Sequence, residues 1–236
     1  MNISIVMPVF NEEKNIEDFV DKISMAFLNH DYHIYIIDDC STDNTSKILA
    51  KIENQNKRVS TVRNGKNSGH GPTTYKALKI GLTSKAKHIL AVDGDGQFKA
   101  EELEELYRSL ESDKNLELVE GIRIRPDEPW YRQSVSLITR ILVFLSCGSM
   151  PKDANTPCRI YKRETLEFLT KQIDPNSLIP NLEISKITRR DKLKFVEKKI
   201  NFISKTGSTW NQTKVQIPSR KFIIFCFKAS MSWLKK

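Results

Sequence analysis

Two aspartates stand one residue apart directly after a short apolar run. The run is His88–Val92, and Asp93 and Asp95 follow it in the stretch AVDGDGQF. A strand that ends at two carboxylates can hold a divalent cation such as Mg²⁺, which takes oxygen ligands and is commonly shared between carboxylate and phosphate. A cation there neutralises charge as a diphosphate leaves, which is Lewis-acid catalysis. Alone the pair is a weak signal, because acidic turns are common.

Two other chemistries also place aspartates at a strand end, and the sequence argues against both. A dinucleotide-binding fold needs a glycine-rich turn after its first strand, but residues 8–11 read Pro-Val-Phe-Asn. Phosphoryl transfer through an aspartyl nucleophile uses an acidic pair after the first strand, followed by threonine. Here the pair follows the fourth apolar run and precedes Gln97. Metal-assisted departure of a nucleoside diphosphate is the chemistry that remains.

Strand and helix signals alternate over the first half of the chain. Short apolar runs predict strands over residues 3–7, 33–37, 59–62, 88–92 and 116–120. Helical spacing of apolar residues predicts helices between them, over about 12–28, 45–52, 69–82 and 99–111. The second half is less regular, with helices predicted over 134–147, 163–171 and 180–190 and a strand over 193–203. The alternation indicates an α/β fold with a mostly parallel central sheet and helices on both faces.

Polar clusters follow four of these predicted strands. They are Pro8–Glu12, Asp38–Asp43, Gly65–Gly71 and Asp93–Gln97. The carboxyl ends of parallel strands meet at one edge of a sheet, and ligands of such sheets bind beyond that edge. We therefore expect the four clusters to converge on one ligand site.

The composition suits one globular domain with an appendage. The chain has 236 residues and a net charge of +9, of which residues 1–100 carry +1 and residues 101–236 carry +8. The second half should therefore attract anions, namely nucleic acid, a membrane surface or a phosphorylated substrate. Nucleic-acid binding would explain the charge but not the four polar strand ends, so we expect no nucleic-acid partner. The four cysteines lack CxxC spacing and read as reduced thiols, and we expect no signal peptide or membrane-spanning segment.

Three stretches together resemble glycosyltransferase family 2, whose members have the inverting GT-A fold. They are SIVMPVFNEEKNI, IYIIDDCSTDNTSKIL and AVDGDGQF, and the resemblance covers roughly residues 2–210. It implies that Pro8, Phe10 and Glu12 line the nucleotide of a UDP- or GDP-sugar. It also implies that Asp39 forms a hydrogen bond with the base. Asp38 is left open between such a role and a simple turn, as is Asp43.

The resemblance also assigns the metal site. Asp93 falls where the first acid of the family motif meets ribose or metal, and Asp95 falls at the metal ligand with a catalytic role. Gln97 matches another metal-site position, and the implied cofactor is Mg²⁺ or Mn²⁺. The segment KNSGHGPTTYKALKIG resembles the glycine-rich stretch after the third strand, where a helix N-terminus favours phosphate. His70 stands there in place of a small residue and either touches the diphosphate or packs.

The acceptor region resembles that of polyprenyl-phosphate transferases such as dolichol-phosphate mannose synthases. In EGIRIRPDEPWYRQSVSLITRILVFL the matching residues are Arg123, Arg132 and Ser136, which the resemblance places near the acceptor phosphate. Arginine suits phosphate because its planar fork is always charged. Asp153, in DANTPCRIYKRETL, falls near the catalytic base of members with hydroxyl acceptors; with a phosphate acceptor it could instead order basic residues. Lys205 stands beside a position where the family has arginine.

These observations lead to one function and two alternatives. We expect residues 1–210 to form the catalytic domain, with 1–122 binding the nucleotide sugar and 123–210 the acceptor, and 211–236 to form a basic amphipathic tail on the membrane surface. The protein would transfer a sugar to a polyprenyl phosphate as a peripheral enzyme at the cytoplasmic face of a membrane. The alternatives are a family 2 transferase with a glycan or protein hydroxyl acceptor, and a non-catalytic nucleotide- or membrane-binding protein. The sequence gives no oligomeric state.

Overall fold

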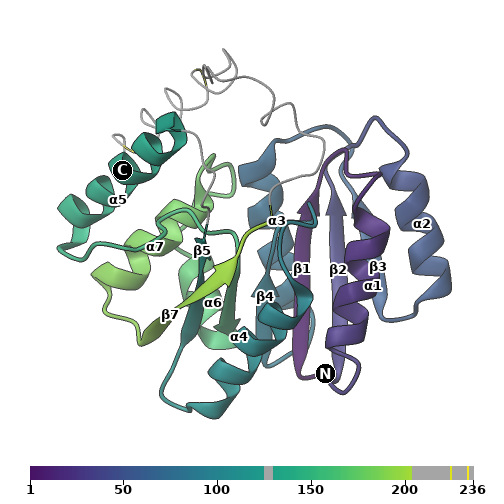
Figure 1. Ribbon diagram of the computed structural model, residues 1–236, viewed down its shortest axis with the longest axis horizontal. Helices are drawn as coiled ribbons and strands as arrows, with labels where there is room; N and C mark the ends of the chain where they lie inside the picture. Colours follow the sequence, from purple (N-terminus) through teal and green to yellow (C-terminus); the bar gives the residue numbers. More distant parts are fainter. Residues whose placement is uncertain (125–129, 204–223, 225–232, 234–236) are drawn as a thin grey trace.

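The computed structural model describes residues 1–124 and 130–203, together with Ile224 and Trp233 (Figure 1). Within them one sheet of seven strands has the order β3-β2-β1-β4-β6-β5-β7. The strands are β1 (Ile3–Val9), β2 (Tyr32–Asp38), β3 (Val59–Arg63), β4 (His88–Ala91), β5 (Leu118–Ile124), β6 (Arg159–Lys162) and β7 (Phe195–Asn201).

The strand directions explain where a ligand site can form. β1 pairs in parallel with β2 and β4, and β2 pairs in parallel with β3. The carboxyl ends of these four strands therefore lie at one edge of the sheet, at the top in Figure 1. β6 runs antiparallel to both β4 and β5, and β5 is parallel to β7. The mostly parallel sheet expected from the sequence is confirmed.

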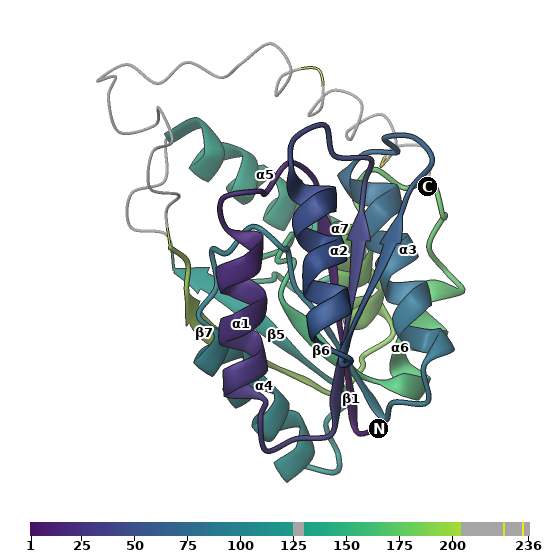
Figure 2. The same cartoon turned by 90° about the vertical axis from the view of Figure 1, so that its right-hand side faces the viewer.

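Helices cover both faces of the sheet (Figure 2). They are α1 (Ile16–Ala26), α2 (Thr45–Gln55), α3 (His70–Thr83), α4 (Ala100–Ser112), α5 (Trp130–Cys147), α6 (Arg163–Thr170) and α7 (Pro180–Arg190). Side chains alternate along a strand, so Ile5 and Met7 of β1 pack with α1, α2 and α4 while Val6 packs with α3, α6 and α7. β1 is thus buried on both faces, which explains why its sequence is apolar except for Ser4.

The structure differs from the sequence prediction in the second half of the chain. β6 was not predicted, because its four residues include Arg159 and Lys162 and present no apolar run. The strand predicted to end at residue 120 continues to Ile124, since β7 pairs with it in register up to Asn201. As a result Arg123 lies on a strand. α5 begins at Trp130, one turn earlier than predicted.

The predicted tail, residues 211–236, lies outside the described residues apart from Ile224 and Trp233. Trp233 packs against a small apolar cluster of Val143, Ile179 and Leu182. Within the described part of the chain, no helix combines the length and apolar character needed to cross a membrane. The division into a nucleotide part, an acceptor part and a tail stays a prediction.

Candidate functional site at the carboxyl edge of the sheet

The loops after β1 and β2 are joined by hydrogen bonds. The backbone N–H of Asn11 donates to Ser41 Oγ at 3.0 Å, and Asn11 Oδ1 accepts from the N–H of Thr42 at 2.8 Å. The N–H of Glu12 donates to Thr45 Oγ1 at 2.8 Å, at the start of α2. Asn11 adopts a left-handed backbone with φ of 56°, a conformation that asparagine tolerates better than most residues. The first two polar clusters are therefore one connected surface.

Asp39 joins the third cluster to the second. Its buried carboxylate accepts from Asn64 Nδ2 at 2.8 Å and from the backbone N–H groups of Ser68 and Gly69, both at 2.9 Å. Gly69 has a φ of 89°, which a side chain would strain. Asp39 thus fixes the glycine-rich loop just before α3. Its predicted contact with a nucleotide base stays a prediction, and Asn64 is a site residue that the sequence analysis missed.

The remaining aspartates of the second cluster hold turns. Asp38 Oδ1 accepts from the N–H of Ser41 at 2.9 Å, and Asp43 Oδ1 accepts from the N–H of Thr45 at 3.0 Å. Burial raises the pKa of Asp43, but hydrogen bonds from Thr45 and Glu13 outweigh it, so that its pKa lies below the usual value. Of the two roles that the sequence left open for these aspartates, the structure shows contacts of the turn kind.

The loop that carries the acidic pair packs closely against the end of β1. The N–H of Gly94 donates to the carbonyl of Pro8 at 3.2 Å, and a Cβ at position 94 would lie 2.5 Å from Val9 Cγ2. Only glycine fits at that distance, so the loop is pinned to β1 through the residue between the two aspartates. Asp95 Oδ1 accepts from the N–H of Gln97 at 3.1 Å.

The first and third clusters also present side chains at this edge. Asp93 has 24% of its side chain exposed, and His70, with 57% exposed, places Nε2 3.7 Å from Asp93 Oδ1. His70 therefore lies at the site and does not pack in the core. Phe10 is 44% exposed and Pro8 is half-buried. Glu12 accepts from Asn15 Nδ2 at 3.2 Å, near the start of α1. These side chains are at least partly exposed at the carboxyl edge of the sheet, and their predicted contacts with a nucleotide stay predictions.

The acidic pair fits a divalent cation that is shared with a ligand. In residues 1–124 and 130–203, no three His, Cys, Asp or Glu side chains gather closely enough to hold a metal ion. Carboxylate oxygens from Asp93 and Asp95 are hard donors, and Mg²⁺ in nucleotide sites is usually completed by phosphate oxygens and water. The side-chain amide of Gln97 donates to the carbonyl of Ile203 at 2.8 Å, which anchors the chain after β7 to this loop.

An arginine and an aspartate predicted for the acceptor side form an ion pair. Arg123 donates to Asp153 through Nε at 2.7 Å and through Nη2 at 2.9 Å, and Nη2 also donates to the carbonyl of Asn155 at 2.8 Å. Both side chains are about nine-tenths buried, with 13% and 10% exposed. The Arg123 guanidinium lies 5.6 Å from the ring centre of Phe202, and that ring packs on Phe98, with centroids 5.3 Å apart. Phe98 directly follows the acidic loop in the chain, so Phe202 links Arg123 to the end of that loop.

The other predicted acceptor residues lie on or beyond α5. Arg132 is exposed and Ser136 is half-buried, one helical turn further along α5. α5 packs on α7, whereas Arg123 lies on β5. Lys205 lies outside the described residues. The roles of these residues, and of Asp153 as a base, stay predictions.

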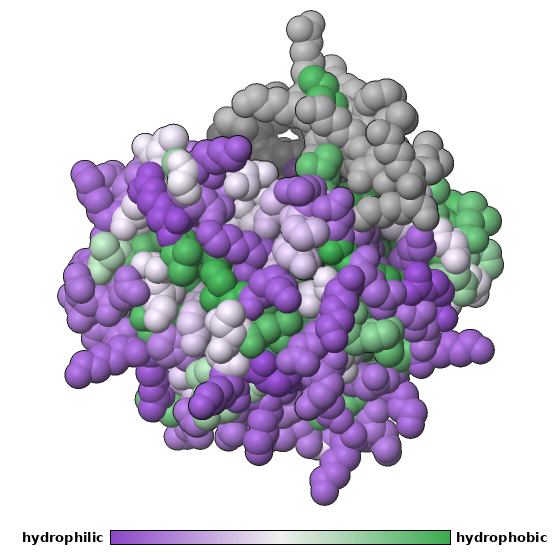
Figure 3. All heavy atoms as spheres, turned by 180° about the vertical axis from the view of Figure 1, so that it is seen from behind, coloured by the Kyte–Doolittle hydropathy of each residue, from purple (hydrophilic) through white to green (hydrophobic). Residues whose placement is uncertain are grey.

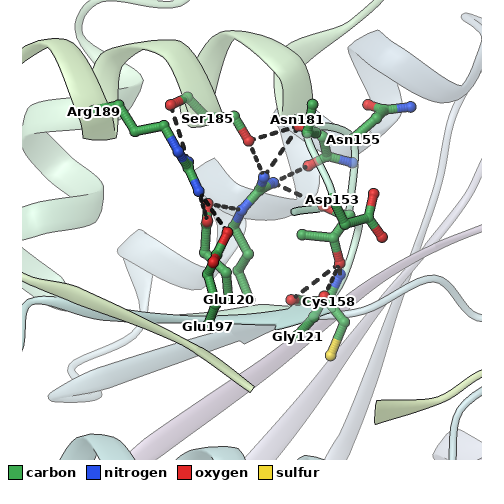
Figure 4. Close-up of polar contacts among 12 residues, drawn as sticks. Glu120, Gly121, Asp153, Asn155, Cys158, Asn181, Ser185, Arg189 and Glu197 are labelled. Carbon is green, nitrogen blue, oxygen red and sulfur yellow. Dashed lines mark hydrogen bonds and ion pairs between the residues drawn. The ribbon is translucent and has the colours of Figure 1, made fainter. Parts of the chain in front are cut away.

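Sequence analysis missed a buried network of charges beside Asp153, to which Glu120, Arg189 and Glu197 belong (Figure 4). Glu120 of β5 receives hydrogen bonds from Arg159 Nε at 2.9 Å and Arg189 Nη2 at 2.8 Å, and Arg189 also reaches Glu197 of β7 at 2.9 Å. A signal for the network in the sequence is Glu120, a glutamate within an otherwise apolar stretch, since a buried charge needs a buried partner.

Comparison with known proteins places the chain in a family. Residues 4–170 match the glycosyl transferase family 2 domain. An uncharacterized protein of Methanocaldococcus jannaschii is 35% identical over 170 residues, which is 69% of this chain and 72% of that protein. The UDP-N-acetylglucosamine–dolichyl-phosphate N-acetylglucosaminyltransferase of Methanococcus voltae is 28% identical over 238 residues and covers 93% of both chains. The undecaprenyl-phosphate 4-deoxy-4-formamido-L-arabinose transferase of Serratia proteamaculans is 26% identical over 184 residues, or 76% of this chain and 55% of its own length.

Solved structures show the same fold at low sequence identity. The glucosyl-3-phosphoglycerate synthase of Mycobacterium tuberculosis, in complex with Mn²⁺, UDP and phosphoglyceric acid, has a TM-score of 0.71 at 15% identity, covering 99% of this chain and 78% of its own. The mannosyl-3-phosphoglycerate synthase of Rubrobacter xylanophilus has a TM-score of 0.65 at 13% identity, covering 100% and 73%. The fold is therefore the GT-A fold, and the chain belongs to glycosyl transferase family 2.

Proposed function

We propose that this protein moves a sugar from a UDP- or GDP-sugar to a polyprenyl phosphate at a membrane surface, with inversion at the anomeric carbon. An oxygen of the lipid phosphate attacks that carbon from the face opposite the nucleotide. The new carbon–oxygen bond forms as the bond to the nucleoside diphosphate breaks. Two relatives support this acceptor class, since the Methanococcus voltae enzyme is named for dolichyl phosphate and the Serratia proteamaculans enzyme for undecaprenyl phosphate.

The observation that carries the proposal is the position of Arg123 beside the acidic loop. The Phe202 ring contacts both Arg123 and Phe98, so a fixed cation lies next to the edge that would hold the donor diphosphate. Within the described part of the chain, Arg123 Nη1 makes no hydrogen bond, whereas Nε and Nη2 are held by Asp153. A guanidinium oriented in this way can offer its remaining N–H groups to an acceptor phosphate.

On the donor side, the protein's own groups bind and orient the nucleotide. Asp93 and Asp95 would hold Mg²⁺ or Mn²⁺ together with diphosphate oxygens, and the bound cation would supply Lewis-acid stabilisation of the departing diphosphate. The N-terminus of α3, which Asp39 fixes in place, adds a favourable field for phosphate. Pro8, Phe10 and Glu12 border the same edge and would contact the nucleoside.

The pairing of Asp153 favours a phosphate acceptor over a hydroxyl acceptor. A hydroxyl group must lose its proton as it attacks, so its enzyme needs a base within reach of that proton. Both oxygens of Asp153 already accept hydrogen bonds from Arg123. A phosphate oxygen is already an anion and needs a positive partner more than a base. In this proposal Asp153 holds Arg123 in place.

The outer face of α5 supports an approach to a lipid surface. Six large apolar side chains of this helix are more than two-fifths exposed, namely Trp130, Leu137, Ile138, Ile141, Phe144 and Leu145. Green side chains gather at the edge of the molecule where α5 lies (Figure 3). An apolar stripe of this kind on a helix that also carries arginine suits the boundary between lipid head groups and acyl chains. The free thiols of Cys40, Cys147 and Cys158 fit the reducing, cytoplasmic side of the membrane.

A transfer assay with competing acceptors tests the proposal. Labelled UDP- and GDP-sugars are supplied with Mn²⁺ and with one acceptor at a time: polyprenyl phosphate in vesicles, 3-phosphoglycerate, or a glycan. We expect label in the lipid fraction alone and its loss in Asp95→Ala, which should fold normally. Arg132→Ala should reduce transfer to lipid phosphate by a large factor. Transfer to a glycan, with Arg132→Ala fully active, would favour the hydroxyl-acceptor alternative, and diphosphate release independent of every acceptor would contradict both.

The membrane part of the proposal has its own test. Ile138→Ser with Leu145→Ser removes two exposed apolar side chains, 55% and 74% exposed, without touching the buried face of α5. The double variant should sediment less with vesicles that contain anionic lipid while keeping the wild-type thermal midpoint. Unchanged sedimentation would mean that α5 does not contact lipid.

A further inference from the structure

Arg159 is a fully buried arginine in β6 with all five of its N–H groups bonded. Nε donates to Glu120 at 2.9 Å, Nη1 to the carbonyl of Thr156 at 2.7 Å and to Asn181 Oδ1 at 3.4 Å. Nη2 donates to Ser185 Oγ at 2.6 Å and to the carbonyl of Ala154 at 3.4 Å. A lysine has only three donors and no planar fork, so no other side chain can make this set of contacts.

Two of these acceptors belong to the loop that precedes β6. Successive residues of that loop contact two different partners in turn. Its backbone groups at Lys152, Ala154 and Thr156 face the buried network: the N–H of Lys152 donates to Glu197 at 2.9 Å, and the two carbonyls accept from Arg159. The residues between them, Asp153 and Asn155, hold Arg123. The buried network and Arg123 therefore bind opposite sides of one short segment, residues 152–156.

Ser185 of α7 adds to the hydrogen bonds between the buried network and this segment. Its hydroxyl accepts from Arg159 and donates to the carbonyl of Ala154 at 2.6 Å, and Figure 4 shows Ser185 within this cluster. The charges in the network balance, with Arg159 and Arg189 facing Glu120 and Glu197. Burying four charges is costly, and apolar residues of similar size often stabilise a fold at least as well. Stability alone is therefore a poor explanation for the network.

We infer that Arg159 is a positioning residue that fixes the segment 152–156 and, through Asp153, aims the guanidinium of Arg123 at the acceptor anion. This inference rests on the proposed function for the role of Arg123. Arg159 itself is wholly buried and touches no substrate. Its effect should therefore fall on acceptor use and leave the nucleotide edge, built from β1, β2 and β4, unchanged.

Two variants test the inference, one with a larger and one with a smaller loss of hydrogen bonds. Arg159→Lys keeps the charge and loses two donors, and Ser185→Ala removes one hydroxyl that bridges Arg159 to Ala154. In both, we expect faster hydrogen exchange at the amides of Arg123 and Cys158, which donate to Asp153 and Thr156. We also expect the KM for acceptor to rise about ten- to a hundredfold in Arg159→Lys, as a displaced positioning group does, with the KM for donor and the UDP-induced thermal shift unchanged.

A matched control separates positioning from loss of stability. Leu110→Ala in α4 removes a buried apolar side chain that is not part of the charged network, and it should lower the thermal midpoint by creating a cavity. It should leave the KM for acceptor at the wild-type value. Suppose that the KM for acceptor rises in both Leu110→Ala and Arg159→Lys, in the same proportion to the stability each has lost. Loss of stability would then explain the effect, and the inference would be wrong.

A double variant provides the sharpest measurement. Because Arg159 acts through Arg123, adding Arg159→Lys to Arg123→Ala should reduce transfer no further than Arg123→Ala alone, to within about twofold. If the losses of transfer activity from Arg159→Lys and Arg123→Ala multiply in the double variant, the inference is wrong while the proposed function is unaffected. If wild-type protein transfers no sugar to polyprenyl phosphate, the proposed function fails. The exchange data still decide the positioning step, and unchanged exchange at Arg123 and Cys158 overturns it.

Discussion

Breaking the Arg123–Asp153 pair should lower the free energy of unfolding by an amount that depends on which hydrogen-bond acceptors remain for Arg123. Asp153→Ala removes both acceptors of the bidentate contact and leaves a guanidinium that is only 13% exposed. Removing one partner of a fully buried pair costs about 3–5 kcal/mol. Since about a tenth of each side chain reaches solvent, we expect the lower end of that range, about 3 kcal/mol. Asp153→Asn keeps one acceptor oxygen and should cost about 1.5 kcal/mol, the smaller value for a hydrogen bond to a charged group.

Urea unfolding followed by tryptophan fluorescence measures these differences at an unchanged m-value. Asn155→Ala is the matched control in the same loop. Asn155 is exposed and contacts Arg123 through its backbone carbonyl, which the substitution retains. Its stability should lie within about 0.5 kcal/mol of wild type. Equal losses for Asp153→Ala and Asn155→Ala would refute the reasoning, because the loop and not the ion pair would then set the cost.

Three further predictions concern the rest of the molecule. Gly94→Ala should push the acidic loop off β1, at a cost of about 1–3 kcal/mol for an overpacked contact, and should weaken UDP binding in calorimetric titration. Asp39→Ala should leave the N–H groups of the glycine-rich loop without their acceptor, which lowers the thermal midpoint and nucleotide affinity together. Burial raises the pKa of Glu104, but hydrogen bonds from Arg108 and His30 hold it below its ordinary value of 4.5. The resulting stabilisation is present above that pH and lost as the pH falls through the lowered pKa, so the stability difference between wild type and Glu104→Gln in urea unfolding should shrink as the pH is lowered from 4.5.

The first half of the fold could be predicted because its strands are covered on both faces. Runs such as Ile3–Met7 are apolar except for Ser4, and the polar residues that follow them stand out by contrast. Once the strands are parallel, the convergence of the four clusters follows from topology alone. Local contacts of Asp43 could also be foreseen, since cap residues bond within a few positions of themselves.

The second half could not be predicted in the same way, because its contacts join residues far apart in the chain. Arg159 is a charged residue in the middle of the sheet, and its counter-charge, Glu120, lies 39 residues earlier in the chain. Arg123 and Asp153 were both identified, but nothing local indicates that they pair across 30 residues. The family resemblance likewise identifies Asp39 as a nucleotide-binding residue, without revealing that it is buried and accepts hydrogen bonds from the backbone of the loop before α3.

Metal-dependent binding of a nucleoside diphosphate is the most direct test of the account. Calorimetric titration of UDP and of GDP into the protein, with and without Mn²⁺, should give saturable binding of one nucleotide that requires the metal. Asp95→Ala should abolish the metal-dependent part while the thermal midpoint of the free protein stays unchanged. Binding that is equally tight without metal, or that Asp95→Ala leaves intact, would contradict the assignment of the carboxyl edge of the sheet as the donor site.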